Sequence, residues 1–327
     1  MSQGSALGEF ELIERFFRRP TRSAVLGIGD DAALLQPSVG CEIAISVDML
    51  VSGRHFFADA DPRSLGHKTL AVNLSDMAAM GATPRWALLA GALTSADGAW
   101  LAAFSRGLFE LADALGVELV GGDTTRGPLT LCVTIVGEVP AGQALRRSGA
   151  RAGDSIWISG RLGSAALALA HLQEQVKLSA DEFARCERAL LWPIPRVALG
   201  LRLRGLATAA IDVSDGLTGD LGHVLRASGV GARVDLAAIA HDPALDLQLH
   251  GSQRPVALRC LLAGGDDYEL CFTAPKARDS DVAALAAELD VELTRIGEVI
   301  AATQLTVLDE TGRALSPLPA AFDHFSR

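Results

Sequence analysis

Residues 68–98 read KTLAVNLSDMAAMGATPRWALLAGALTSADG, and the spacing of apolar side chains changes twice along them. The first part has a helical period, which predicts a helix over 62–80 that ends before Gly81. The apolar run that follows predicts a strand over 86–93, and the next helix is expected at Gly98–Leu115. This alternation of helices and strands is typical of a mixed α/β protein.

The alternation continues on both sides of this stretch. The turn-like segment RRSGARAGD at 146–154 separates two runs of elements, so we expect two domains, 1–145 and 146–327. Each run also contains a Gly-Gly-Asp, at 121–123 and 264–266, which hints at two related halves. Expected strands are 32–36, 43–48, 118–120, 129–138, 155–159, 207–211, 232–236 and 268–273, with closing strands within 294–308, and further helices are expected at 9–18, 164–175, 181–191, 195–204, 217–227 and 280–289.

Composition limits the class of protein. The chain has 327 residues, of which 49% are hydrophobic, and this is enough for two folded domains. Its net charge of −10 argues against nucleic acid as a main partner, because proteins that bind a polyanionic backbone carry basic patches. No apolar stretch reaches the ~20 residues of a membrane span, and no signal-peptide pattern opens the chain. We therefore expect no membrane partner and a cytoplasmic location, where the five cysteines stay reduced.

Aspartate dominates the acidic residues. The chain contains 24 Asp and 15 Glu, although Glu is the better helix former. Capping explains acids such as Asp61 and Asp181, which precede expected helices. It does not explain Asp48 and Asp212 at the ends of apolar strands, or Asp76 within an apolar helical turn. A buried carboxylate needs a partner or a metal ion, and a solvated helix face is the alternative for Asp76.

The segment GIGDDA at 27–32 has the spacing of a dinucleotide-binding fingerprint, with Asp48 about 20 residues further on. However, Asp30 and Asp31 stand where a pyrophosphate would approach, and the AALLQP that follows is too short for the required helix. With Mg²⁺ the same carboxylates would favour phosphate, because hard cations bridge carboxylate and phosphate oxygens.

Two further segments place small residues and oxygen donors directly after expected strands. They are GGDTTRG at 121–127 and IDVSDGL at 211–217, where backbone N–H groups can bind phosphate. The lysine-containing P-loop and the protein-kinase motifs are absent from the sequence. Any phosphoryl chemistry must therefore use another scaffold.

Seven segments along the chain resemble, in order, those of the thiamine-monophosphate kinase family. They are LGIGDDAALL, AISVDMLVSGRHF, KTLAVNLSDMAAMGATP, LVGGDTTRGPL, LRRSGARAGD, AIDVSDGLTGDLGH and AGGDDYELCFT. The SDMAAMGA and GGDT types are shared with the wider aminoimidazole ribonucleotide synthetase superfamily, whereas GIGDDAAL, SGRHF and GGDDYEL together indicate the thiamine enzyme. Selenophosphate synthetase and a hydrogenase maturation protein fit less well, because each needs a terminal cysteine that this sequence lacks.

The resemblance implies a fold, a reaction and a set of contacts. The fold would be α/β (α+β), a two-domain arrangement of the aminoimidazole ribonucleotide synthetase type with mixed sheets packed with helices. Its first domain would bind metal and ATP and form a homodimer, and its second would close over nucleotide and substrate. The reaction would be ATP-dependent phosphorylation of thiamine monophosphate to thiamine diphosphate with several Mg²⁺ ions. The implied metal ligands are Asp31, Ser46, the backbone of Val47, Asp48, Asp76, Asp123, Asp212 and Asp215; the implied ATP contacts are Gly122, Asp123, Arg147 and Ser214; the implied substrate contacts are His55, Asp266 and Phe322.

Two positions depart from the family pattern. Val47 replaces a threonine of some relatives, which is harmless only if the backbone is the ligand, and Asp266 replaces a glutamate, which shortens the reach. Three contacts also have a purely structural interpretation. His55 can be a loop histidine, Arg147 part of a solvated basic turn, and Phe322 a core residue.

Other classes of function remain open at this point. Another ATP-dependent enzyme of the superfamily would share most motifs, and an NAD-dependent oxidoreductase would use GIGDDA and be stabilised by NAD rather than by Mg-ATP. A calcium-binding module is disfavoured, because the EF-hand spacing is missing. For the kinase we expect direct in-line transfer with no protein nucleophile, because the implied site has no serine, lysine or cysteine paired with a general base. The acceptor phosphate, with a second pKa of about 6, is already largely ionised and needs little assistance from a base.

Overall fold

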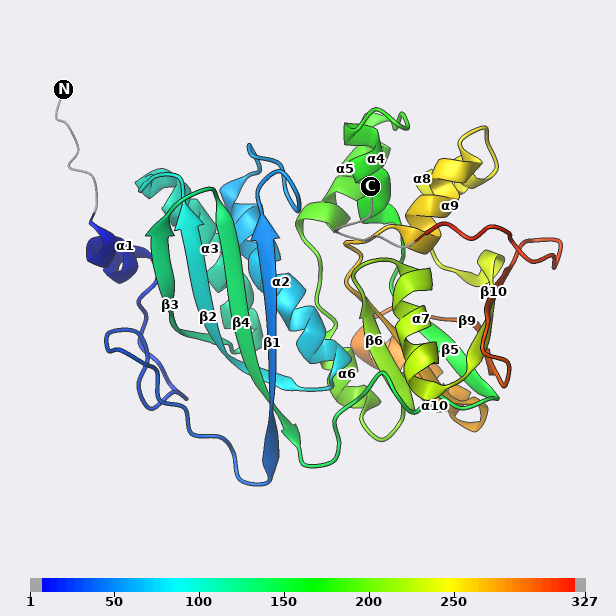
Figure 1. Cartoon of the computed structure of the whole chain (residues 1–327), viewed down its shortest axis with the longest axis horizontal. Coiled ribbons are helices and arrows are strands. Elements are labelled where there is room, and N and C mark those ends of the chain that lie inside the picture. The colour runs from blue at the N-terminus through cyan, green and yellow to red at the C-terminus, as the bar shows by residue number, and fades with distance from the viewer. Residues whose placement is uncertain (1–7, 321–327) are drawn as a thin grey trace. The chain divides into compact units, whose positions relative to one another are not determined.

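The computed structural model describes residues 8–320, and the chain divides into two compact units (Figure 1). The first unit contains the chain up to Gly142 except 78–81, and the second contains 78–81 and the chain from Gln143. The expected domain boundary after residue 145 lies three residues beyond this division. Among the described residues, no helix has the length and apolar character needed to cross a membrane.

The first unit is built on a four-stranded sheet with two long helices behind it (Figure 1). The strand order is β1-β4-β2-β3, and β4 is antiparallel to both β1 and β2. Strand β3 is parallel to β2, because helix α3 makes the crossover between them. The elements are α1 (Glu9–Phe16), β1 (Cys41–Val51), α2 (Pro62–Ala79), β2 (Thr83–Leu93), α3 (Gly98–Leu115), β3 (Glu118–Arg126) and β4 (Thr130–Pro140).

Helix α3 has the bounds expected from the sequence, because both of its ends carry strong signals. The side chain of Asp97 caps its start by accepting the backbone N–H groups of Ala99 (2.8 Å) and Trp100 (3.2 Å). Gly116 ends it in the left-handed conformation, with φ of 68°. Helix α2 ends at Ala79, one residue before the expected end.

Helices α2 and α3 approach each other closely at two glycines. A Cβ on Gly66 would lie 2.0 Å from the carbonyl oxygen of Phe104, and one on Gly107 would lie 1.8 Å from that of Arg63. Any larger side chain would push the backbones apart. The two helices therefore pack backbone to backbone.

The second unit is built on a six-stranded sheet in the order β10-β7-β9-β5-β8-β6. Only β10 and β7 are parallel; the other neighbours are antiparallel. As β5 and β6 both run antiparallel to β8, their ends meet the start of β8 at one edge of the sheet. The elements are β5 (Asp154–Ser159), α4 (Ser164–Leu172), α5 (Ala180–Leu191), α6 (Val197–Leu203), β6 (Ala209–Val213), α7 (Leu217–Ser228), β7 (Gly231–Asp235), η1 (Leu236–Ala238), α8 (Pro243–Leu249), α9 (Arg254–Ala263), β8 (Glu269–Pro275), η2 (Lys276–Arg278), α10 (Asp279–Leu289), β9 (Leu293–Ile300) and β10 (Leu305–Leu308).

The expected strand at 32–36 is absent. Within it only Leu34 pairs, in an isolated antiparallel bridge with Leu26. The run is short, and Pro37 behind it has no N–H group to extend a ladder. The apolar residues there therefore belong to a folded-back loop rather than to the sheet.

Helices α5, α8 and α9 also differ from expectation. Helix α5 is capped by Ser179, whose hydroxyl accepts the N–H of Glu182, so the expected capping role of Asp181 is wrong. Helices α8 and α9 were not expected at all. Each nevertheless has a proline in its first turn, and Asp242 caps α8 directly before Pro243.

Candidate active site

Three implied metal ligands of the first unit meet where β1 passes helix α2. Ser46 and Asp48 lie on one face of β1, and Asp76 lies on α2. The hydroxyl of Ser46 donates a hydrogen bond of 2.5 Å to the carboxylate of Asp76. The backbone N–H of Asp48 donates to the side-chain oxygen of Asn73, also on α2, at 3.2 Å. Helix α2 therefore presents oxygen atoms to this face of β1.

Val47 lies on the opposite face of β1, and the residue is 59% exposed. Valine has no polar side-chain atom, so any metal contact of this residue would come from its backbone, as the resemblance implies. We expected Asp48 to end a strand, and this is wrong, because β1 continues to Val51. Its carboxylate projects from within the strand.

The Gly-Gly-Asp at 121–123 lies inside β3, not in a loop after a strand as expected. Gly122 pairs with Leu89 of β2, and Asp123 pairs with Ala90. Gly122 has φ of 151°, and a Cβ there would lie 1.9 Å from the carbonyl oxygen of Leu89, so only glycine fits. The segment is therefore an edge strand that carries an exposed carboxylate.

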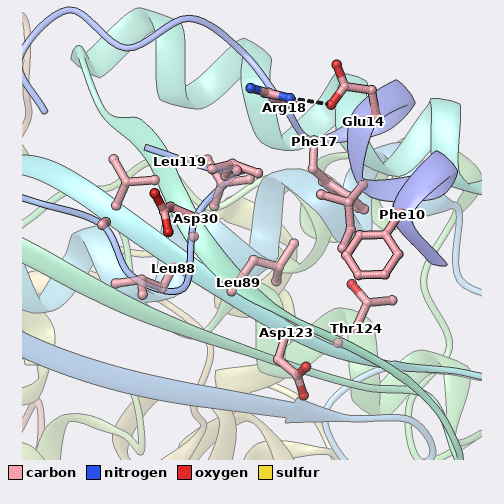
Figure 2. A pocket seen from close by; sticks show the side chains of 18 of the residues that line it. Phe10, Glu14, Phe17, Arg18, Asp30, Leu88, Leu89, Leu119, Asp123 and Thr124 are labelled. Carbon is pink, nitrogen blue, oxygen red and sulfur yellow. Dashed lines mark hydrogen bonds and ion pairs between the residues drawn. The ribbon is translucent and has the colours of Figure 1, made fainter. Parts of the chain in front are cut away.

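A cavity of about 610 Å³ adjoins this part of β3 (Figure 2). Helix α1, the residue after it and helix α3 supply apolar walls that include Phe10, Phe17 and Phe104. Asp31 and Asp123 line the same cavity, although they lie far apart in sequence. The cavity thus combines an apolar, aromatic wall with carboxylates.

The segment at 27–32 does not have the structure of a dinucleotide-binding fingerprint. It forms a turn and isolated bridges, and the backbone N–H of Asp31 donates to the side chain of Asp30 (2.9 Å). In the described chain, no helix lies between α1 and β1. The strand-turn-helix context that such a fingerprint requires is missing, which confirms that its spacing is misleading here.

Asp48 and Asp123 lie at opposite edges of the sheet of the first unit. By the strand register, Asp48 is opposite Val133, Val133 is opposite Leu89, and Leu89 is opposite Gly122. Three inter-strand spacings put about 14 Å between Asp48 and the backbone beside Asp123. Among the described residues, no three His, Cys, Asp or Glu side chains come together as a group that could hold a metal ion. Within one chain, the acids on β1 and α2 are therefore separate from Asp123.

His55 lies in the loop after β1 and is half-buried. Its Nδ1 accepts a hydrogen bond of 3.0 Å from the backbone N–H of Val51. Since Nδ1 is an acceptor, the proton of the neutral imidazole is on Nε2. The ring is thus oriented by the strand end and has a donor on its other side.

In the second unit, β6 and the turn after it carry three of the implied contacts. Asp212 lies inside β6 and is 5% exposed, while Ser214 and Asp215 form the turn before α7. The carboxylate of Asp220, in the first turn of α7, accepts the N–H groups of residues 214, 215 and 216 at 3.1, 3.0 and 3.1 Å. The expectation that these N–H groups bind phosphate is therefore wrong, because a carboxylate of the chain already fills their position.

Two acids beside this turn have raised pKa values. Burial raises the pKa of Asp220 to about 6, although its three N–H partners act in the opposite direction. Burial also raises the pKa of Asp267 well above its usual range, against the N–H of Gly163, which donates to both carboxylate oxygens (3.0 and 2.9 Å). Both carboxyl groups are therefore more easily protonated than an exposed aspartate.

The Gly-Gly-Asp-Asp-Tyr segment at 264–268 is bonded to the same turn. The N–H of Asp266 donates to the carbonyl of Ser214 (2.9 Å), and the N–H of Tyr268 donates to that of Val213 (2.9 Å). Asp266 and Tyr268 have positive φ angles, 69° and 50°, which side chains rarely adopt. The hydroxyl of Tyr268 donates to the carboxylate of Asp266 at 3.0 Å. These bonds hold Asp266 beside Ser214.

Sequence reasoning missed an ion pair at this edge of the sheet. Arg196 donates two hydrogen bonds to Glu269, at 2.6 and 2.5 Å, and the hydroxyl of Ser159 donates a third, at 2.5 Å. A charged residue that opens the apolar strand β8 was the available signal. Arg147 is exposed before β5, and Phe322 lies outside the described residues.

Comparison with known proteins gives one consistent result. The family model of the AIR synthase related protein N-terminal domain matches residues 29–139, and that of the C-terminal domain matches 151–310. Thiamine-monophosphate kinase of Escherichia coli (strain K12) is 45% identical over 325 residues, which cover 98% of this chain and 99% of that protein.

Solved structures agree with the sequence relatives. The crystal structure of thiamine-monophosphate kinase from Stenotrophomonas maltophilia K279a has a TM-score of 0.83 and 48% identity, over 90% of this chain and 92% of that one. A structure described as AaThiL complexed with AMPPCP and TMP has a TM-score of 0.76 and 27% identity, over 97% of each chain. The likeness in both cases extends across both units.

Proposed function

The chain belongs to the thiamine-monophosphate kinase family of AIR synthase related proteins, and we propose that it transfers the terminal phosphoryl group of ATP to thiamine monophosphate, giving thiamine diphosphate. The observation that carries this proposal is the 45% identity to thiamine-monophosphate kinase over 98% of the chain. Incubation of the purified chain with ATP and thiamine monophosphate, followed by chromatography, tests it. A chain that forms no thiamine diphosphate, or phosphorylates only free thiamine, would contradict it.

We assign several Mg²⁺ ions to this reaction. Carboxylate and hydroxyl oxygens are the ligands that Mg²⁺ prefers, and the oxygen donors on β1 and α2 are of this kind. When bound, Mg²⁺ would offset the repulsion between the two polyanionic substrates. The proposed ligands are Asp31, Ser46, the backbone of Val47, Asp48, Asp76, Asp123, Asp212 and Asp215.

The cavity beside β3 is the proposed site for the nucleoside of ATP. An adenine ring needs an apolar, partly aromatic surface, and Phe10, Phe17 and Phe104 line the cavity. Gly122 and Asp123, the proposed ATP contacts of this unit, line it as well. In the second unit, the proposed ATP contacts are the side chains of Arg147 and Ser214.

Thiamine monophosphate is the proposed ligand of His55, Asp266 and Phe322. His55 can donate from Nε2 to a phosphate oxygen, because its Nδ1 is already an acceptor. The carboxylate of Asp266 suits the cationic part of the substrate, and an aromatic ring at 322 would stack on it. Replacement of His55 by Ala should raise KM for thiamine monophosphate more than KM for ATP.

We further infer that the enzyme is a homodimer in which two copies complete each site. Asp123 is separated from Asp48 by two intervening strands, so one chain does not bring both acids to the same metal ion. A second copy can supply the missing group. One face of β1 carries three exposed apolar residues: Ile45 is 67% exposed, Val47 59% and Met49 54%. A long apolar edge strand of this kind favours pairing with another chain.

Light scattering tests the dimer. The wild-type chain should have twice the mass of one chain, and a charge introduced by Ile45→Glu should shift it towards the monomer and lower activity. The substitution Leu247→Glu is the matched control, because Leu247 is also exposed (64%) but lies on α8 of the second unit. A wild-type chain that remains monomeric at all concentrations would contradict the proposal.

Transfer is proposed to be direct and in line. The acceptor phosphate needs little assistance from a base near pH 7, since its second pKa is about 6. One finding modifies the argument from the sequence: Ser46 is hydrogen-bonded to a carboxylate, so a candidate nucleophile with a partner does exist. Direct transfer therefore predicts inversion at a chiral γ-phosphorus and no label on the enzyme. Retention, or labelled phosphate that remains on denatured wild-type chain but not on Ser46→Ala, would refute it.

The proposed location is the cytoplasm. All five cysteines are free, as expected in a reducing compartment that also supplies ATP. Fractionation of cells that produce the chain tests this directly.

A further inference from the structure

The turn between β6 and α7 has the shape of an anion-binding nest. Its three consecutive N–H groups, at residues 214–216, converge on a single point. Such a concavity of backbone N–H groups is a common phosphate site. Here one oxygen of Asp220 occupies that point, at 3.0 to 3.1 Å from each nitrogen.

The turn is also held from its other side. The N–H of Asp266 donates to the carbonyl of Ser214, and a Cβ on Gly265 would lie 2.4 Å from that carbonyl oxygen. Gly216 has φ of 112°, and a Cβ on it would lie 2.6 Å from the backbone of Ala263. The backbone of the turn is therefore held by its close approach to residues 263–266, and its three N–H groups all donate to Asp220.

We propose that Asp220 is a positioning residue for nucleotide binding, which holds Ser214 and Asp215 in their binding arrangement by filling the nest that a phosphate would otherwise occupy. This inference rests on the proposed function, which assigns ATP and metal contacts to these two residues. It has a chemical consequence: the nucleotide meets the side chains of the turn and not its N–H groups.

A purely structural role for Asp220 predicts a different result. A carboxylate that only stabilises the fold would change the melting temperature when it is removed, but not the affinity for nucleotide in the folded protein. A positioning role changes that affinity selectively. It also makes the loss reversible, because the empty nest of an Ala variant can accept a small anion in place of the side chain.

The experiment measures binding of a non-hydrolysable ATP analogue with Mg²⁺ by titration calorimetry. Asp220→Ala should weaken binding about tenfold or more, because three hydrogen bonds to a charged group are lost. Sodium formate should restore most of the affinity, and the neutral formamide should not. Affinity for thiamine monophosphate should change less than twofold. Unchanged binding of the analogue, or no rescue by formate, would overturn the proposal.

Two further variants keep the test decisive. Asp220→Asn retains an acceptor oxygen and is expected to fold with about three- to tenfold weaker analogue binding, so it decides the matter if the Ala variant does not fold.

Asp242→Ala is the matched control: Asp242 is also buried, at 8% exposure, and caps a helix of the same unit by accepting the N–H of Ala244 (2.9 Å). It should lower the melting temperature without changing analogue affinity, and an equal loss of affinity in it would contradict a specific role of Asp220. A wild-type chain that does not bind the analogue would overturn the proposed function itself, whereas normal wild-type binding with unaltered variants would overturn only the role of Asp220.

Discussion

Asp76 differs from a fully exposed acid in two ways. It is partly buried on α2, and it accepts a short hydrogen bond from Ser46. We predict that Asp76→Asn reduces turnover about ten- to hundredfold at limiting Mg²⁺, because the amide keeps the shape but removes the charge that would hold the proposed cation. Raising the Mg²⁺ concentration should restore part of the activity. Initial rates across a Mg²⁺ series measure both effects.

The control for this prediction is Asp113→Asn. Asp113 lies on α3, is 70% exposed and pairs with Arg19 at 3.0 Å, so it should contribute little to activity. The Mg²⁺ dependence of this variant should match that of the wild type. Equal Mg²⁺ dependence of Asp76→Asn and the wild type would remove Asp76 from the metal site.

Tyr268 is the only tyrosine of the chain, and its hydroxyl donates to Asp266. We predict that Tyr268→Phe raises KM for thiamine monophosphate about fivefold with little change in kcat, since one hydrogen bond of about 1 kcal/mol orients Asp266, the proposed substrate contact. Steady-state kinetics with each substrate varied in turn measure the split. If KM for ATP rises as much as KM for thiamine monophosphate, the hydroxyl supports the turn as a whole rather than Asp266.

At the scale of single residues, the sequence shows residue types and their local order, but not which residues are hydrogen-bonded to one another in the fold. The motifs around Asp48, Asp76 and Asp123 could be identified because carboxylates are rare in apolar segments. The role of Asp220 could not, because an acid in the first turn of a helix looks like ordinary helix capping. Its three N–H partners depend on the path of the turn before the helix, which no spacing rule predicts.

Gly107 permits the contact between helices α2 and α3. We predict that Gly107→Ala lowers the free energy of unfolding by about 2–3 kcal/mol, because its Cβ would overlap the carbonyl oxygen of Arg63. The control is Gly222→Ala on α7, whose Cβ would meet only the flexible end of Arg226, at 3.2 Å. That change should be neutral or stabilise by up to about 1 kcal/mol through helix propensity. Urea unfolding of both variants compares them, and similar losses would contradict backbone packing at Gly107.

Glu138 ties β4 to the segment before β1 and to β2. Burial raises the pKa of its carboxyl, but the N–H and hydroxyl of Ser38 and the guanidinium of Arg85 outweigh burial and leave the pKa below its ordinary value. A depressed pKa stabilises the folded state above the unfolded pKa, and this contribution is lost as pH falls through the folded pKa. We predict a steeper loss of stability below about pH 4.5 in the wild type than in Glu138→Gln. Identical pH profiles of the free energy of unfolding would contradict this account.

Elements could be predicted where their ends are signalled locally. Helix α3 has an aspartate cap and a glycine stop, and its bounds were predicted correctly. The segment at 32–36 has a strand composition, yet it finds only one bridge partner. The expected strand at 118–120 extends to Arg126, because β2 offers a partner for its glycines. Pairing is a long-range property, so strand composition alone does not fix where a strand ends.

At the scale of the whole molecule, the order of strands determines which acids can cooperate. The sequence brings no information on whether β1 and β3 are neighbours, and the observed order β1-β4-β2-β3 places them at opposite edges. The motifs alone therefore favour a metal cluster within one chain, whereas the strand order separates its acids. The proposed ligands are distributed over both units, and those of the first unit lie at separate places on its sheet.

Hybrid dimers test this division directly. If each site takes Asp48 and Asp76 from one copy and Asp123 from the other, Asp48→Asn and Asp123→Asn should each be nearly inactive alone. Co-expression of the two should recover about one quarter of wild-type activity, because half of the dimers are mixed and each mixed dimer has one intact site. Co-expression of Asp48→Asn with Asp76→Asn should recover none, since both changes lie on the same side of the site and every mixed site keeps one defect. Activity per dimer distinguishes these outcomes, and mixed dimers isolated by two different tags on the chains should have about half of the wild-type activity. Recovery in neither mixture would mean that one chain holds the whole site, and recovery in both would mean that the acids act independently.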